Sequence, residues 1–315
     1  MRRDASGASG EVGRVNATRI SERVHMIDTM ALGQPRTVAV YVVRGAKTAL
    51  VDCGYASSYE AVLEGLAAVG VSASDVDYVI PTHVHLDHAG GAGLLLKRMP
   101  RATVLAQEKG VPHLIDPTRL VESATRVFGR DAIDTFGIPV GIEKERITAV
   151  GEEEHLDLGG VSLTMVHSPG HAPHQLSVLV EEEKLLLTAD AVGIVYPAVR
   201  SMIPTTPPPS FNLRELWDST ERLEQMGSRA LLVPHFGTRD DAQEVLETTR
   251  KKTDAWVRKV KEMRKAGFTI EQMVESLRRE LSLESGIQEK YFPQYASVSI
   301  GVSVSGILHY LEKNP

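Results

Sequence analysis

Four side chains able to bind a metal ion stand within six positions of one another in the segment T-H-V-H-L-D-H-A-G-G, residues 82–91. They are His83, His85, Asp87 and His88, and they follow the short apolar run Val79-Ile80. Imidazole and carboxylate groups suit zinc and neighbouring transition metals, whereas unpartnered buried His and Asp carry a large desolvation cost. The segment therefore predicts a metal site rather than a surface histidine cluster.

The spacing within this segment indicates more than one ion. In an extended chain alternate side chains project from one face, so His83 and His85 can converge on one point. Asp87 has the same parity, and the following Ala-Gly-Gly lets the backbone turn, which would aim Asp87 and His88 at a neighbouring point. Two adjacent ions fit this arrangement.

Three later strand ends also carry metal-competent side chains. An alternating strand, Val161 to Val166, ends at Ser-Pro-Gly just before His171. Two short apolar strands lead to Asp190 and to His235. Each of these residues alone is typical of an ordinary loop or a helix cap, and only their joint arrangement predicts that they meet at one rim.

Together these elements resemble the metal-binding signature of the metallo-β-lactamase superfamily of hydrolases, in the family's order, from about Val24 to Gly237. The resemblance implies an α/β fold, the αββα sandwich of two β-sheets with helices on the outer faces. It also implies two divalent metal ions, zinc first, with iron and manganese as alternatives. By resemblance, one ion is held by His83, His85 and His171 and the other by Asp87, His88 and His235, with Asp190 bridging them beside a water-derived hydroxide.

This ligand set predicts hydrolysis. The two divalent cations carry four positive charges, and the carboxylates of Asp87 and Asp190 together with a hydroxide carry three negative charges. The site therefore has a net formal charge of about +1, which favours a developing oxyanion. An ion of the zinc type lowers the pKa of bound water to about 7. Asp87 is the candidate catalytic residue, placed to orient the hydroxide and take its proton. Asp52, at the end of an apolar strand, is the candidate partner of a ligand histidine, the alternative being a turn-forming Asp.

The fold hosts many chemistries and does not name the substrate. By resemblance, the presence of both His88 and Asp190 favours the glyoxalase II-like thioesterase, lactonase and phosphodiesterase branches over classical β-lactamases. We expect a small-molecule substrate, namely a carboxylic ester, lactone or thioester. The alternatives are a phosphodiesterase of the same fold and a mononuclear iron enzyme resembling the persulfide dioxygenases, which share a similar signature.

Loops beside the ligands supply the candidate substrate contacts, which are His174, Tyr196, Pro207 and Phe236. Lactonases of the family use a tyrosine shortly after the bridging aspartate, where Gly193 stands here and Tyr196 is a looser substitute. Pro207 lies in a proline-rich segment, residues 203–209, that cannot form a central strand or helix. We expect a stiff loop at the metal mouth, the alternative being a plain surface connector.

Composition restricts the partners and the compartment. The 315 residues are 42% hydrophobic and 24% charged, which fits one globular α/β domain with an appendage. A formal charge of −6 and the lack of a basic, aromatic-interleaved stripe argue against nucleic acid. The single cysteine, Cys53, fits a reducing cytoplasm, and the polar residues after Arg2-Arg3 encode neither a signal peptide nor a membrane span.

The chain divides into three parts: a flexible tail (residues 1–14), the metallo-β-lactamase-fold catalytic domain (residues 15–239) and a helical C-terminal extension (residues 240–315). The extension carries basic runs at 250–252 and 258–261, which are typical of a solvated helix face; the alternative is a positive flank that attracts anionic substrates. Its apolar, glycine-containing segment, residues 299–308, would pack against its own core or against a second subunit in a homodimer.

Overall fold

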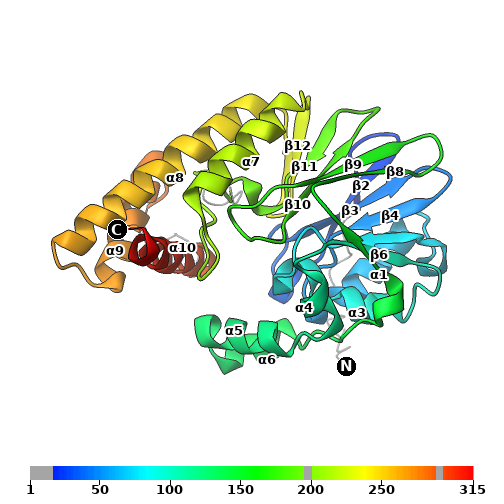
Figure 1. Cartoon of the computed structure of the whole chain (residues 1–315), viewed down its shortest axis with the longest axis horizontal. Coiled ribbons are helices and arrows are strands. Elements are labelled where there is room, and N and C mark those ends of the chain that lie inside the picture. Colours follow the sequence, from blue (N-terminus) through cyan, green and yellow to red (C-terminus); the bar gives the residue numbers. More distant parts are fainter. Residues whose placement is uncertain (1–16, 195–200, 289–293, 315) are drawn as a thin grey trace, which may run out of the picture.

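The computed structural model describes residues 17–194, 201–288 and 294–314, and it contains two stacked β-sheets flanked by helices (Figure 1). The first sheet has the strand order β1-β2-β3-β4-β5-β6-β7, and the second has the order β13-β12-β11-β10-β9-β8. The strands of the first sheet are β1 (Ala17–Arg19), β2 (Val24–Asp28), β3 (Ala39–Arg44), β4 (Thr48–Val51), β5 (Tyr78–Ile80), β6 (Thr103–Gln107) and β7 (Ile147–Val150). Those of the second are β8 (Glu153–Asp157), β9 (Ser162–His167), β10 (Leu176–Val180), β11 (Leu185–Leu187), β12 (Ala230–Val233) and β13 (Gly237–Arg239).

Central strands are apolar on both faces because both faces of each sheet are covered. In β3, Tyr41 and Val43 point into the core between the sheets, where they join Leu163 and Val178 of the second sheet. The alternate residues of β3 point the other way, into the core under the outer helices. This two-sided burial explains why β3 reads as a continuous apolar run rather than as an alternating one.

Helices close both outer faces. On the first sheet, α1 (Tyr59–Ala68) and α3 (Ala92–Leu96) contribute Leu66 and Leu95 to a shared core. On the second sheet, α7 (Leu213–Gln225) and α8 (Ala242–Lys265) contribute Leu223 and Leu246 in the same way. The predicted αββα sandwich is therefore confirmed.

The remaining helices lie at the rim and beyond the sandwich. They are α2 (Leu86–Ala89), α4 (Val111–Ile115), α5 (Thr118–Phe128), α6 (Arg130–Phe136), α9 (Ile270–Ser285) and α10 (Gln294–Lys313). The helical extension after residue 239 is present as predicted. Its core around Trp256, Leu277 and Ile300 also includes Ile203 and Leu216 from the preceding part of the chain. One face of α10 is thus buried within its own chain, which is one of the two arrangements expected for it.

The basic runs of α8 are largely paired with acids. Arg250 lies 2.6 Å from Glu224 of α7, and Lys252 and Lys259 contact Glu284 and Glu280 of α9. These ion pairs join neighbouring helices and favour a structural role over a positive flank for anionic substrates. The predicted tail, residues 1–14, lies outside the described residues. No helix in the described part of the chain is both long and apolar enough to cross a membrane.

Candidate metal centre

All predicted ligands lie at one rim of the sandwich because strands from both sheets end there. In the first sheet β4 and β5 are parallel, and in the second β11 and β12 are parallel. Backbone hydrogen bonds join the two sheets at this rim: Leu176 N donates to Thr82 O at 2.7 Å, and Ala39 N donates to Pro234 O at 2.7 Å. The loops that carry the ligands are therefore fixed relative to one another.

The route by which the first four ligands converge differs from the extended chain expected. Strand β5 ends at Ile80, the segment 81–85 bends, and Asp87 and His88 stand on the one-turn helix α2. Gly90 and Gly91 have ordinary helical φ values of −56° and −77°. A Cβ on Gly91 would lie 2.5 Å from Cys53 O, so this glycine permits close packing rather than a sharp turn.

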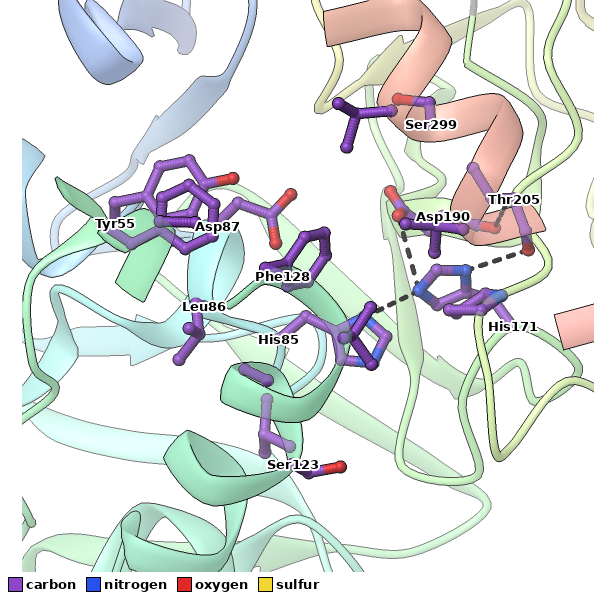
Figure 2. A pocket seen from close by; sticks show the side chains of 18 of the residues that line it. Tyr55, His85, Leu86, Asp87, Ser123, Phe128, His171, Asp190, Thr205 and Ser299 are labelled. Carbon is purple, nitrogen blue, oxygen red and sulfur yellow. Dashed lines mark hydrogen bonds and ion pairs between the residues drawn. The ribbon is translucent and has the colours of Figure 1, made fainter. Parts of the chain in front are cut away.

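Seven side chains converge at the rim, and Asp190 lies between two groups of them. Asp190 Oδ2 is 3.4 Å from His171 Nε2, while its Oδ1 is 3.5 Å from His88 Nε2 and 3.4 Å from His235 Nε2. On one side, His85 Nδ1 lies 3.0 Å from His83 Nε2 and 2.9 Å from His171 Nε2. On the other side, Asp87 Oδ2 lies 3.6 Å from His88 Nε2 and 3.7 Å from His235 Nε2. Figure 2 shows His85, His171 and Asp190 meeting at the base of a pocket.

These distances fit ligands of metal ions. Tetrahedral zinc with bonds of about 2.05 Å places its ligand atoms about 3.3 Å apart, which falls within the 2.9 to 3.7 Å found between neighbouring donors here. His88 Nε2 and Asp190 Oδ1 are also buried without a hydrogen-bond partner. Because a buried unsatisfied polar atom costs about 1–3 kcal/mol, a cation that contacts both atoms would remove a real penalty. The cluster therefore fits divalent metal ions.

The far nitrogens of three of the rings lie against acceptors, which fixes the orientation of these rings. His88 Nδ1 donates to Asp52 Oδ2 at 3.0 Å, and His171 Nδ1 donates to the carbonyl of Thr205 at 3.1 Å. His235 Nδ1 lies 3.3 Å from Thr37 O. Since a carbonyl only accepts, these rings carry their proton on Nδ1 and turn Nε2 toward the cluster.

Asp52 supports both halves of the cluster. Its Oδ2 accepts from His88, while its Oδ1 accepts from both the backbone N–H and the hydroxyl of Thr82 at 2.8 Å. The Thr82 hydroxyl in turn lies 3.2 Å from His83 Nδ1. Asp52 occupies the left-handed region with φ 63°, a conformation that Asp and Asn tolerate better than most residues. Asp52 thus contacts a predicted ligand histidine, His88; that this contact supports metal binding stays a prediction.

Replacing Asp52 with Asn should weaken metal binding about 10- to 100-fold while leaving the fold intact. Asn keeps the backbone conformation and the size of the side chain, but one carboxylate oxygen becomes an amide donor. Competition with a chelator of known affinity measures the change. Asp77→Asn is the matched control, because Asp77 also accepts from a backbone N–H, that of Thr48, but away from the cluster. Equal affinities of the two variants would contradict the role of Asp52.

The histidines on the His85 side are held neutral. Burial, reinforced by the neighbouring rings, keeps the pKa of His83 well below its usual value, and burial together with His171 lowers the pKa of His85 to about 3. Burial also lowers the pKa of His171. Neutral imidazoles are the form that binds a metal ion, so these three rings need to release no proton.

The other side attracts positive charge. Burial opposes the charged form of His88, yet the carboxylates of Asp87, Asp52 and Asp190 outweigh it and raise the pKa of His88 to about 10. Burial likewise opposes protonation of His235, but Asp190 raises its pKa. Although burial favours the neutral acid, His235 and His88 hold the pKa of Asp190 well below its usual range. Carboxylates that draw a cation this strongly suit a divalent ion.

The proline-rich segment connects the ligands to the C-terminal helix. Besides the Thr205 carbonyl that accepts from His171, the Thr205 hydroxyl donates to Asp190 O at 2.9 Å. The neighbouring Thr206 hydroxyl donates to Ser303 O of α10 at 3.0 Å, and the Ser303 hydroxyl donates to Pro204 O. The segment lies at the mouth of the site, as expected, and also fixes two of its ligands.

A cavity of about 690 Å³ opens above the cluster. Of the candidate substrate contacts, His174 and Pro207 line it, and so does His113, which the sequence did not single out. Phe236 is not among the described lining residues; it packs against the core between the sheets, with Arg36 5.6 Å from its ring centroid. Tyr196 lies outside the described residues. At Gly193 a Cβ would lie 2.4 Å from Met202 Cγ, so this position has no room for a side chain.

The sandwich and its rim cluster define an α/β protein built around a candidate metal centre, and sequence comparison gives its family. The profile of the Metallo-beta-lactamase superfamily matches residues 33–235. The chain therefore belongs to the metallo-β-lactamase superfamily, as the sequence motifs indicated.

Individual relatives agree with this assignment. A metallo-beta-lactamase fold-containing protein of Sulfurisphaera tokodaii is 32% identical over 59% of this chain and 67% of its own length. An N-acyl homoserine lactonase of Azorhizobium caulinodans is 34% identical over 39% of this chain, but the match spans only 44% of the lactonase. The crystal structure of a metallo-beta-lactamase family protein of Thermus thermophilus superposes with a TM-score of 0.63, 23% identity and coverage of 88% and 89% of the two chains. The family and its members support a metal-dependent hydrolase in general.

Proposed function

We propose that this protein is a dinuclear metal-dependent hydrolase that acts on a small carboxylic ester, lactone or thioester. The observation that carries the proposal is the position of Asp190, which directs one carboxylate oxygen toward His171 and the other toward His88 and His235. A site for a single ion has no need of an aspartate that faces two groups of donors. One group would be His83, His85 and His171, and the other Asp87, His88 and His235.

Divalent ions bound there would lower the pKa of water to about 7 and polarise the carbonyl oxygen of the substrate. The residues of the chain would hold the ions in place and balance part of their charge. Asp190 and Asp87 balance part of the positive charge, and Asp52 and Thr205 hold rings in the orientation that turns Nε2 to the centre.

Asp87 is the carboxylate best placed to move a proton. Its side chain is 22% exposed, compared with 6% for Asp190, and both line the cavity. In the proposed reaction the Asp87 carboxylate orients the attacking water and accepts its proton, and later returns the proton to the leaving group. Asp190, enclosed by three histidines, stays ionised throughout.

The named activity of one relative, N-acyl homoserine lactonase, supports an acyl compound as substrate. The lack of space at Gly193 speaks against the tyrosine that lactonases place after the bridging aspartate. We therefore treat esters, thioesters and lactones as equally good candidate substrates. If the protein hydrolysed phosphodiesters instead of acyl compounds, it would still be a hydrolase, but the proposed substrate class would be wrong.

Purified protein should contain two divalent ions per chain, and their removal by a chelator should abolish hydrolysis, which re-added zinc, manganese or iron(II) then restores. Elemental analysis gives the stoichiometry, and esters, lactones, thioesters and phosphodiesters are assayed on the same sample. A single iron per chain with oxygen consumption and no hydrolysis would overturn the proposal in favour of an oxygenase.

A further inference from the structure

Helix α5 has an apolar face of which Leu120 alone is found packed against the core under the outer helices. Leu120, Ser123, Ala124, Val127 and Phe128 follow the i, i+3, i+4, i+7, i+8 spacing of one helix face, and all five line the cavity. No residue of α5 is buried, and Val127 and Phe128 are 40% and 39% exposed. Such a face normally packs against the body of a protein, so its exposure over a cavity indicates a ligand.

Helix α10 provides the opposite wall. Its residues Ile300, Val304 and Ile307 are buried in the C-terminal core, whereas Val298 and Val302 line the cavity. Val298 is 48% exposed. Figure 2 shows Phe128 and Ser123 on one side of the pocket and Ser299 of α10 on another, the side on which Asp190 and His171 also lie. The helix is thus apolar toward the core, and toward the cavity it presents these two valines together with Ser299 and Ser303.

The third wall is the proline-rich segment, of which Pro207, Pro208 and Pro209 line the cavity. The base consists of predicted metal ligands, among them His85, Asp87 and Asp190. A cavity of about 690 Å³ is within the range of small-molecule sites, about 300–1,000 Å³. Its walls are largely apolar, with single serines between the apolar side chains, and its base is polar.

Charge around the cavity argues against an anionic tail. Arg119 is the single Lys or Arg among the described lining residues, and it is exposed at the start of α5. Recognition of a carboxylate or phosphate uses buried cationic groups or paired donors, and the walls formed by α5, α10 and the prolines offer mainly hydrocarbon. An uncharged apolar chain matches these walls.

We propose that the substrate carries an apolar acyl chain, which lies between α5 and α10 with its carbonyl group at the metal centre, and that Leu120, Val127 and Val302 set the preferred chain length. This proposal rests on the proposed hydrolysis for the position of the carbonyl group. The apolar subsite itself does not depend on catalysis.

Binding of primary alcohols from butanol to octanol tests the subsite without any bond to hydrolyse. Each alcohol competes with the neutral fluorescent probe N-phenyl-1-naphthylamine on the metal-loaded protein. Each added methylene should tighten binding about fourfold until the cavity is full. A triple variant adds polar atoms to the subsite while keeping the side-chain shapes: Leu120→Asn, Val127→Thr and Val302→Thr. Octanol should bind to this triple variant at least about tenfold more weakly than to the native protein. Leu283→Asn is the control, since Leu283 is 84% exposed on α9 and away from the cavity.

The same proteins are then assayed with p-nitrophenyl esters of butanoate, hexanoate and octanoate. The expected result is that kcat/KM rises with chain length in the native protein and in the control, and that this rise is lost in the triple variant. Binding that shows the chain-length series without hydrolysis would support the subsite and contradict the proposed function. Alkyl phosphates are tested in the same competition assay, with the native protein and with Arg119→Ala. Alcohol binding that is independent of chain length would overturn the proposed subsite. So would a chain-length effect that appears only with the phosphates and is lost in Arg119→Ala.

Discussion

Replacing Asp190 with Ala should lower kcat/KM by about 10³-fold or more, since the electrostatic stabilisation lost is worth several kcal/mol, and should reduce the metal content by at least one ion per chain. The reason is geometric. The two oxygens of Asp190 lie 3.4 to 3.5 Å from three histidines on both sides of the cluster. Alanine would therefore remove a shared donor and also the negative charge that would balance the two proposed cations. Elemental analysis and steady-state kinetics on the same sample measure both effects.

The control separates loss of a ligand from loss of a buried carboxylate. Asp28 is as buried as Asp190, and its oxygens accept from the backbone N–H groups of Met30 and Arg36. Asp28→Ala should therefore destabilise the protein by about 1–3 kcal/mol while the metal content stays at two ions per chain. An Asp190→Ala protein that keeps both ions and its activity would refute the bridging position, and circular dichroism shows whether the fold is retained.

Much of this site could be predicted because its residues sit where strands end. The sequence predicts the turn after Val166 and the short strands before Asp190 and His235. Neighbouring parallel strands end at the same edge of a sheet, so the loops that follow them lie close together. The local path was not predictable in the same way. An extended chain and a bend followed by one turn of helix both deliver His83, His85, Asp87 and His88, and the sequence contains no feature that distinguishes them.

Other features depend on tertiary contacts that have no local signal. The carbonyl oxygen of Thr205 holds His171, and any residue has such an oxygen. The apolar pattern of α5 is periodic, but periodicity does not reveal whether a face meets the core or a cavity. Phe236 follows His235 in the sequence, yet its side chain packs against the core between the sheets and is not among the described lining residues of the cavity.

One layer of contacts connects the helical extension to the predicted metal ligands. Ser303 of α10 exchanges hydrogen bonds with Pro204 and Thr206, and Thr205 between them holds both His171 and Asp190. The geometry at the ligands therefore depends on how closely α10 approaches the proline-rich segment. Gly306 sets that approach, because a Cβ at this position would lie 1.8 Å from Thr206 O and 2.7 Å from Pro207 C.

Gly306→Ala should destabilise the protein by about 1–3 kcal/mol, although alanine normally stabilises a helix. The backbone of the proline-rich segment or the helix must move to admit the methyl group, and Thr205 moves with it. We therefore expect binding of the ion next to His171 to weaken about tenfold, the lower end of the effect of disturbing a partner of a ligand. Urea unfolding of the metal-free protein and chelator competition measure the two effects separately.

Gly301→Ala on the same helix is the matched control with the opposite sign. Its nearest neighbour would be Val274 Cγ2 at 3.9 Å, so the methyl group fits, and the substitution should stabilise the helix by about 0.5–1 kcal/mol without changing metal affinity. If both alanine variants were stabilised equally, α10 would not hold the segment closely. If Gly306→Ala lost stability but kept full metal affinity, the contact would stabilise the fold without positioning His171 and Asp190.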